Sequence, residues 1–222
     1  MAEPHALPRV KLCGVRELDP LLALLGSDPV SGLGVEAVGF IAWESSPRRV
    51  SADDTAGLVP LVPGNVTPVA VFVDATPDDA ADWIAESGAG AVQLCGNERP
   101  ADWRGFTVPI LRRVGVAPGA ERELEAWSGI AWGFVLDAPD APGGTGKEVD
   151  LAIAARLARL APCLLAGGLD ERNVAERIRA VRPQGVDASS RLEISPGVKD
   201  PARVEAFLAA VRAGFAAAEG GG

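Results

Sequence analysis

The sequence is poor in the side chains that most often carry enzyme chemistry. Its 222 residues include one histidine, His5, and no tyrosine. A Ser-His-Asp triad or a multi-histidine metal site therefore cannot be built in the core of this chain. Any proton transfer near neutral pH has to be carried out by Cys, Asp, Glu or Lys side chains.

Cysteine is also scarce. The three cysteines, Cys13, Cys95 and Cys163, lie far apart, and none forms a CxxC pair. This spacing indicates neither a disulfide framework nor a zinc site, and it suits a reducing compartment. We therefore expect a cytoplasmic protein with free thiols and no metal.

Long apolar runs and excess positive charge are absent as well. No run reaches the length of about 18 residues that a membrane span needs, and the start "MAEPHALPRV" does not resemble a secretory signal. A net charge of −9 argues against nucleic-acid or anionic-lipid partners. A small anionic substrate stays possible if positive groups gather locally.

The chain does contain an alternation of short β-like runs and helical patterns. The β-like runs cover 9–15, 36–43, 68–74, 91–96, 108–116, 132–137, 163–168 and 185–190. Helical patterns cover 19–27, 51–62, 76–87, 119–129, 148–160, 169–182 and 200–218, with a weak one at 99–105. Near-continuous Val, Ile, Leu and Ala runs indicate strands that are buried on both faces of a parallel sheet.

Eight such units predict an α/β fold of the (β/α)8 TIM-barrel class. We expect one domain over 1–222, with flexible ends at 1–8 and 219–222. The alternative is an open doubly wound sheet, but no GxGxxG follows the first strand. Polar residues also end many strands, as they do at the active-site rim of barrels: Cys13, Glu44, Asp74, Cys95, Asp137 and Ser189.

The first strand, "RVKLCGV", places a lysine and a thiol on one face. Side chains alternate along a strand, so Lys11 and Cys13 point the same way. A free cysteine in such a strand is ordinarily a small buried hydrophobe, although a nearby lysine favours the thiolate. Asp187 in the last strand, which neighbours the first in a closed barrel, is the expected ion-pair partner of Lys11.

Four other segments contain candidate site residues. Asp137 ends an apolar strand and either caps a loop or, with its pKa raised by burial, acts as a general acid. Arg48 in "ESSPRRVS" is either solvated or binds a carboxylate. The loops "AGGLD" (166–170) and "ASSR" (188–191) follow the last two strands, where barrels often bind phosphate.

Together these segments resemble one family. "KLCG", "GFIAWESSPRRVS", "VAVFVD", "VQLCG", "FVLD" with "GGTGK", "LLAGGLDERNV" and "GVDASSRLEISPGVKD" occur in the order of phosphoribosylanthranilate isomerase, an enzyme of tryptophan biosynthesis. The resemblance implies a cofactor-free Amadori rearrangement of a phosphorylated small molecule, N-(5-phosphoribosyl)anthranilate, into 1-(2-carboxyphenylamino)-1-deoxyribulose 5-phosphate. It leaves a monomer or a homodimer open.

The resemblance also implies roles for individual residues. Cys13 is expected to be the general base and Asp137 the general acid, while Arg48 contacts the anthranilate carboxylate. The remaining substrate contacts are expected from Cys95, Gly144, Gly146, Gly167, Gly168, Ser189 and Ser190. The last four of these would hold the phosphate.

Three positions depart from the family pattern. Cys95 stands where "QLHG" has a histidine, Arg191 stands where "SSG-E" has a glycine, and Arg49 replaces a common aromatic residue. Cys95 and Arg191 favour a second hypothesis, a barrel that binds phosphate with weak or lost catalysis. A third is the related aminoaldose isomerase of histidine biosynthesis, which uses two aspartates. The cysteine that ends strand one argues against it.

Overall fold

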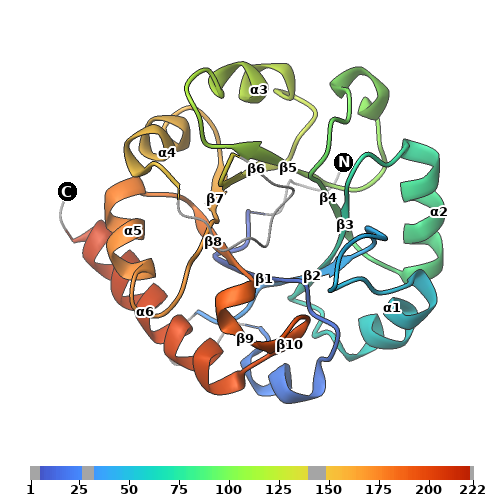
Figure 1. Ribbon diagram of the computed structural model, residues 1–222, viewed down its shortest axis with the longest axis horizontal. Helices are drawn as coiled ribbons and strands as arrows, with labels where there is room; N and C mark the ends of the chain where they lie inside the picture. Colours follow the sequence, from blue (N-terminus) through green and yellow to red (C-terminus); the bar gives the residue numbers. More distant parts are fainter. Residues whose placement is uncertain (1–5, 27–32, 140–148, 221–222) are drawn as a thin grey trace.

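The computed structural model describes residues 6–26, 33–139 and 149–220. Eight parallel strands close into a barrel in sequence order (Figure 1), which confirms the predicted (β/α)8 fold. The strands are β1 (Val10–Cys13), β2 (Ala37–Ile41), β3 (Thr67–Phe72), β4 (Ala91–Leu94), β5 (Ile110–Gly115), β6 (Gly133–Asp137), β7 (Cys163–Leu165) and β8 (Gly185–Ala188).

An outer ring of helices surrounds the barrel. The α-helices are α1 (Ala52–Leu58), α2 (Pro77–Ser87), α3 (Glu121–Ala126), α4 (Leu151–Ala158), α5 (Val174–Val181) and α6 (Pro201–Glu219). Short 3₁₀ turns are η1 (Asp19–Leu24), η2 (Val59–Leu61), η3 (Pro100–Trp103) and η4 (Ser190–Leu192). The helix expected at 19–27 is therefore the 3₁₀ turn η1, whose second residue is a proline that lacks a backbone donor.

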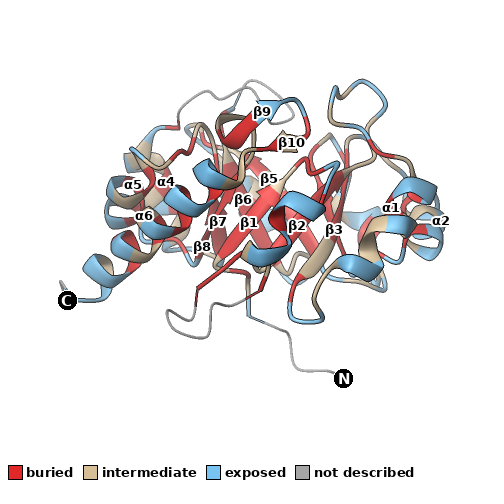
Figure 2. Ribbon diagram, turned by 90° about the horizontal axis from the view of Figure 1, so that it is seen from below, coloured by how far each residue is buried: buried red, intermediate tan, exposed pale blue. Residues whose placement is uncertain are grey.

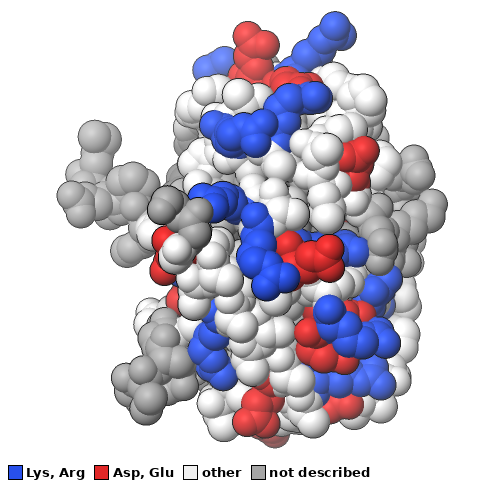
Figure 3. Space-filling model, turned by 90° about the vertical axis from the view of Figure 1, so that its left-hand side faces the viewer, with Lys and Arg blue, Asp and Glu red and all other residues white. Residues whose placement is uncertain are grey.

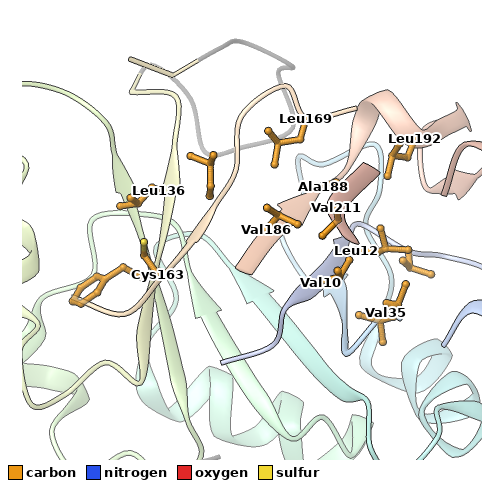
Figure 4. Packing of buried hydrophobic residues seen from close by; sticks show 14 of the residues in the cluster. Val10, Leu12, Val35, Leu136, Cys163, Leu169, Val186, Ala188, Leu192 and Val211 are labelled. Atoms are coloured by element: carbon orange, nitrogen blue, oxygen red, sulfur yellow. The ribbon is translucent and has the colours of Figure 1, made fainter. Parts of the chain in front are cut away.

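Strand alternation divides the apolar side chains into two cores. The larger core lies between the sheet and the helices, and Figure 4 shows Leu12, Leu136, Cys163 and Val186 within it. The smaller core fills the barrel interior: Ala37, Val69, Ala91, Leu111, Val135, Leu164 and Ala166, with Leu7 and Trp132 packed against it. Cys163 therefore faces away from the barrel interior. The packing of Leu7 falls within the segment that we expected to be flexible.

A hairpin that the sequence analysis did not identify lies over one end of the barrel. Strands β9 (Glu193–Ser195) and β10 (Val198–Lys199) pair antiparallel and lie at the upper edge of the molecule in Figure 2. Pro196 and Gly197 form the turn between them, and Gly197 has φ +87°. Proline followed by a residue with positive φ is typical of a type II turn. The letters "SPGV" therefore contained the signal.

The seam of the barrel carries the predicted buried ion pair. Lys11 of β1 lies opposite Asp187 of β8 in the strand register, and Lys11 Nζ donates to Asp187 Oδ2 at 2.9 Å. The exposed fractions of the two side chains are 0% and 6%. Burial opposes a charge on Lys11, but the attraction of the Asp187 carboxylate outweighs it and raises the pKa of Lys11. The ammonium group therefore stays protonated inside the barrel.

The outer surface carries charges of both signs. Figure 3 shows acidic and basic side chains interspersed on the face covered by α4, α5 and α6. The surface that Figure 3 shows therefore has no single basic stripe of the kind that tracks a phosphate backbone.

No helix among the described residues is long and apolar enough to span a bilayer.

We predict that Lys11→Met lowers the free energy of unfolding by about 3–5 kcal/mol, because Asp187 would be left as a buried charge without its partner. Denaturant unfolding followed by circular dichroism measures this loss. The double variant Lys11→Met, Asp187→Leu should recover most of it, because an apolar pair needs no desolvation of charge.

The exposed pair Arg99–Asp102 provides the matched control, since its side chains are 79% and 40% exposed. Arg99→Met should change the free energy of unfolding by less than about 1 kcal/mol. A Lys11→Met loss no larger than that of Arg99→Met would contradict a stabilising role for the buried pair.

Candidate active site

A cavity opens at the C-terminal ends of the strands, which is the end where barrels build active sites. Its lining brings together eight of the ten predicted site residues: Cys13, Arg48, Cys95, Asp137, Gly167, Gly168, Ser189 and Ser190. The other two, Gly144 and Gly146, lie outside the described residues. Glu44 and Asp74 also follow strands but are not part of the lining. Glu44 is 79% exposed and pairs with Arg49.

The backbone around Cys13 is fixed from three directions. The Cys13 carbonyl accepts hydrogen bonds from Ser189 Oγ at 2.9 Å and from Lys199 Nζ at 2.6 Å. Gly14 follows with φ +70°, and a Cβ there would lie 2.6 Å from Arg48 Cδ. Only glycine fits this turn without strain or collision. The "KLCG" sequence therefore positions the thiol at the end of β1.

The electrostatic setting of Cys13 differs from the sequence-based expectation. We expected the lysine below it to lower the pKa of the thiol. In the structure burial raises the pKa of Cys13, and Asp187 adds to this, while Lys11 and Lys199 oppose it without reversing it. Desolvation of a thiolate in a closed barrel outweighs a cation whose charge is already shared with Asp187. A thiol whose pKa lies above its ordinary value is mostly protonated at neutral pH.

Asp137 ends β6 with its carboxyl group at the cavity, and its side chain is 14% exposed. Burial raises the pKa of Asp137, as expected for an acid ending an apolar strand. The Ala138 amide donates to Asp137 Oδ1 at 2.8 Å, and Arg113 lies 3.6 Å from Oδ2. Both oppose the shift without cancelling it. The group can therefore hold a proton at a pH where an exposed aspartate has lost it.

Cys95, the second thiol at the cavity, has a different environment from Cys13. Gln93 Nε2 donates to its sulfur at 3.2 Å. Burial raises the pKa of Cys95 to about 12, although Gln93 and Arg113 counteract part of the effect. A thiol with this pKa is neutral under physiological conditions, so Cys95 suits contact with a ligand and not proton abstraction.

Arg48 is held in place by the hairpin. Its Nε and Nη2 donate to the two carboxylate oxygens of Glu193 at 2.9 and 2.8 Å. Glu193 also accepts from Lys199 Nζ at 2.7 Å. This network connects the loop after β2 to β9 and β10, directly beside Cys13. Sequence reasoning found Arg48 but missed Glu193 and Lys199, because the hairpin that carries them was not recognised.

The loops after β7 and β8 form a glycine- and serine-lined end of the cavity. Gly167 and Gly168 have φ +83° and +60°, which larger residues rarely adopt. Arg191, the residue in place of the family glycine, lies in η4 and is not among the described residues with positive φ. Its Nη1 donates to Asp170 Oδ2 at 3.1 Å. The arginine therefore fits this loop without backbone strain.

Buried polar atoms without a hydrogen-bond partner concentrate at the cavity. Four occur in the described part of the chain, and three belong to lining residues: Gln93 Oε1, Arg113 Nε and Asp187 Oδ1. Such atoms are costly unless a ligand or water satisfies them. Among residues 6–26, 33–139 and 149–220, no group of three His, Cys, Asp or Glu side chains could hold a metal ion. The three unpartnered atoms at the cavity favour a ligand with polar groups.

The sequence analysis did not identify Gln93 or Arg113 as site residues. Both lie in phase with inward-facing apolar neighbours: Gln93 with Ala91, and Arg113 with Leu111. This alternation was the available signal. The preceding Arg112 faces outward, pairs with Glu98 at 2.6 Å and lies 5.0 Å from the Trp127 ring.

Comparisons with known proteins agree with this geometry. Residues 12–210 match the family described as N-(5'-phosphoribosyl)anthranilate (PRA) isomerase. A relative of that name from Chromohalobacter salexigens is 38% identical over 95% of this chain and 97% of its own length.

Two solved structures extend the comparison. The crystal structure of phosphoribosylanthranilate isomerase from Thermotoga maritima superposes with a TM-score of 0.80 at 28% identity, over 93% of this chain and 99% of that one. An isomerase crystallised with reduced 1-(o-carboxyphenylamino)-1-deoxyribulose 5-phosphate superposes with a TM-score of 0.78 at 28% identity, with the same coverage of both chains. The chain therefore belongs to the N-(5'-phosphoribosyl)anthranilate isomerase family of tryptophan biosynthesis.

Proposed function

We propose that this barrel isomerises N-(5'-phosphoribosyl)anthranilate with Cys13 as general base and Asp137 as general acid. The observation that carries the proposal is that both groups line one cavity together with the predicted phosphate loops. No cofactor is needed, because the rearrangement only moves protons within the substrate.

Ring opening is the step assigned to Asp137. A proton must reach the furanose oxygen while the C1–O bond breaks, so that the anomeric carbon becomes an iminium ion. Only a protonated carboxyl group can donate it. The burial that raises the pKa of Asp137 supports this role.

Enolamine formation is the step assigned to Cys13. A base removes the proton from C2 of the sugar, and the C2–H electron pair moves to reduce the iminium ion. Tautomerisation of the enol then gives the ketose. The active form of the base is the thiolate, and Lys11 and Lys199 stabilise it partially against burial.

The remaining residues are proposed to hold the substrate. Gly167, Gly168, Ser189 and Ser190 take the phosphate, and Gly144 and Gly146 stay predictions outside the described residues. Arg48 contacts the anthranilate carboxylate, and Cys95 contacts the substrate. A cytoplasmic location and a monomeric or homodimeric state also stay predictions.

Turnover of freshly prepared N-(5'-phosphoribosyl)anthranilate, followed by loss of its fluorescence, tests the proposal. We expect a single exponential decay that is much faster than spontaneous decomposition of the substrate. The second hypothesis, a barrel that binds phosphate with little catalysis, predicts binding of the reduced product analogue without turnover. The features that motivated it, Cys95 and Arg191, are both accommodated in the structure.

We predict that Cys13→Ser lowers kcat by at least about 10²-fold, because a serine hydroxyl supplies almost no alkoxide as a base. Cys95→Ser should act mainly on KM, since that thiol is neutral and touches substrate without accepting its proton. Steady-state kinetics on both variants measures the difference. A Cys13→Ser enzyme with wild-type kcat, beside a Cys95→Ser enzyme that has lost it, would place the base on β4 instead.

We also predict a broad plateau in the pH dependence of kcat/KM. The acid is needed protonated and the base deprotonated, while the pKa of Asp137 lies below that of Cys13. The fraction of enzyme with both groups in the active form is then constant between the two pKa values. It falls below the pKa of Asp137 and above that of Cys13. Burial raises both pKa values, so both limbs should lie above the ordinary values for Asp and Cys. A profile with a sharp maximum at neutral pH would contradict the assignment.

A further inference from the structure

The proposed substrate carries two anionic groups, and the site residues account fully for only one of them. The phosphate has the glycine- and serine-lined loops after β7 and β8. The aryl carboxylate, at the other end of the molecule, needs a cation with free hydrogen-bond donors. The inference below rests on the proposed function and concerns which residue supplies that cation.

Arg48 alone is poorly suited to this task. Two of its three guanidinium nitrogens donate to Glu193, and its side chain is 13% exposed. The bidentate pair neutralises its charge and fixes its orientation. A substrate carboxylate there would approach a cation that already has a buried carboxylate as its partner.

Arg113 of β5 has the missing properties. It lines the cavity and its side chain is 11% exposed. Its Nη2 donates to the Ala138 carbonyl, which orients the group. Its Nε is buried without a hydrogen-bond partner. Arg113 forms an ion pair with Asp137, in which its Nε lies 3.6 Å from Oδ2. That distance is too long for a hydrogen bond.

The order of the strands places Arg113 at the correct end of the cavity. In the closed barrel β3 and β4 lie opposite β7 and β8, and β2 and β5 flank them (Figure 1). A substrate anchored by its phosphate at β7 and β8 extends toward β3 and β4. Trp43, Val71 and Val73 line the cavity there and offer apolar surface to an aryl ring. Arg48 and Arg113 stand on the two sides of that position.

We propose that Arg113 binds the aryl carboxylate of the substrate. The bound carboxylate then neutralises the Arg113 charge that acts on Asp137. In the empty cavity the Arg113 guanidinium favours the ionised form of Asp137. When a substrate carboxylate pairs with Arg113, that cation is neutralised and Asp137 gains a proton more easily. Recognition of the correct substrate therefore prepares the acid that opens its ring.

Binding of two matched ligands tests the proposal. Reductive amination of ribose 5-phosphate with anthranilate or with aniline gives arylamino-deoxyribitol phosphates that differ only by the carboxylate. Calorimetry should show that Arg113→Met weakens the anthranilate ligand by about 10- to 100-fold, the usual effect of losing a hydrogen bond to a charged group. The aniline ligand should change by less than about threefold, because it has no group for Arg113 to bind.

Arg49→Met is the matched control. Arg49 is adjacent to Arg48, is 42% exposed and pairs with Glu44 outside the cavity, so both ligands should bind this variant as they bind wild type. Equal losses of both ligands in Arg113→Met would assign Arg113 a structural role and overturn the proposal. Unchanged affinity for both would overturn it as well. Neither result depends on turnover, so a folded enzyme that binds but does not isomerise would refute the proposed function separately.

The pH profile of kcat/KM supplies a second readout. Among the described residues, the charged groups that act on Asp137 are Arg113 of β5, Lys11 of β1 and Asp187 of β8. Removing the Arg113 charge raises the pKa of Asp137 in the free enzyme. The acidic limb of Arg113→Met should therefore move to higher pH, while Arg49→Met keeps the wild-type limb. An unmoved limb in Arg113→Met would contradict the coupling of the two residues.

Discussion

The buried ion pair between Lys11 and Asp187 is the interaction on which the site depends. It lies at the seam where the last strand of the barrel meets the first, and both partners face inward. Each charge would be costly alone, so the pair favours the one register in which the two strands meet at these positions. The same register places Cys13 one layer above Lys11 and brings Ser189 to the Cys13 carbonyl. Closure of the barrel and assembly of the site are therefore one event.

Burial in this cavity shifts the pKa values of the two proposed proton-transfer groups in the same direction, with opposite consequences for their proposed roles. It raises the pKa of Asp137, which helps a general acid, and raises the pKa of Cys13, which hinders a general base. A drier cavity would therefore improve one step at the expense of the other. Lys11 and Lys199 limit the cost at Cys13 without removing it. The ammonium group of Lys11 is held by Asp187 and that of Lys199 by Glu193. Burial still lowers the pKa of Lys199, and Glu193 opposes this effect.

The sequence predicts much of this structure because strand periodicity and turn chemistry are local signals. The eight strands, their inward faces, the ion pair across the seam and the clustering of Cys13, Asp137 and the phosphate loops follow from them. The hairpin that carries Glu193 and Lys199 was missed because its strands are only two and three residues long. The pKa of Cys13 was misjudged because neighbouring letters reveal a lysine but not the depth of the pocket around it. Arg113 was missed because "RR" by itself does not distinguish the arginine that faces the helices from the one that faces the cavity.

An arginine beside a general acid is unfavourable unless its charge is needed for something else. Burial raises the pKa of Asp137 and Arg113 lowers it, so before substrate binds Arg113 opposes the role proposed for Asp137. Its backbone contact with Ala138 explains its orientation but not its charge, since a neutral donor would serve equally well. A cation at this position is explained when an anionic ligand binds in the cavity and forms an ion pair with it. Three observations point to the same occupant, the acidic aryl end of the proposed substrate. They are the unpaired Nε, the ion pair too long for a hydrogen bond and the position of β5 beside β4.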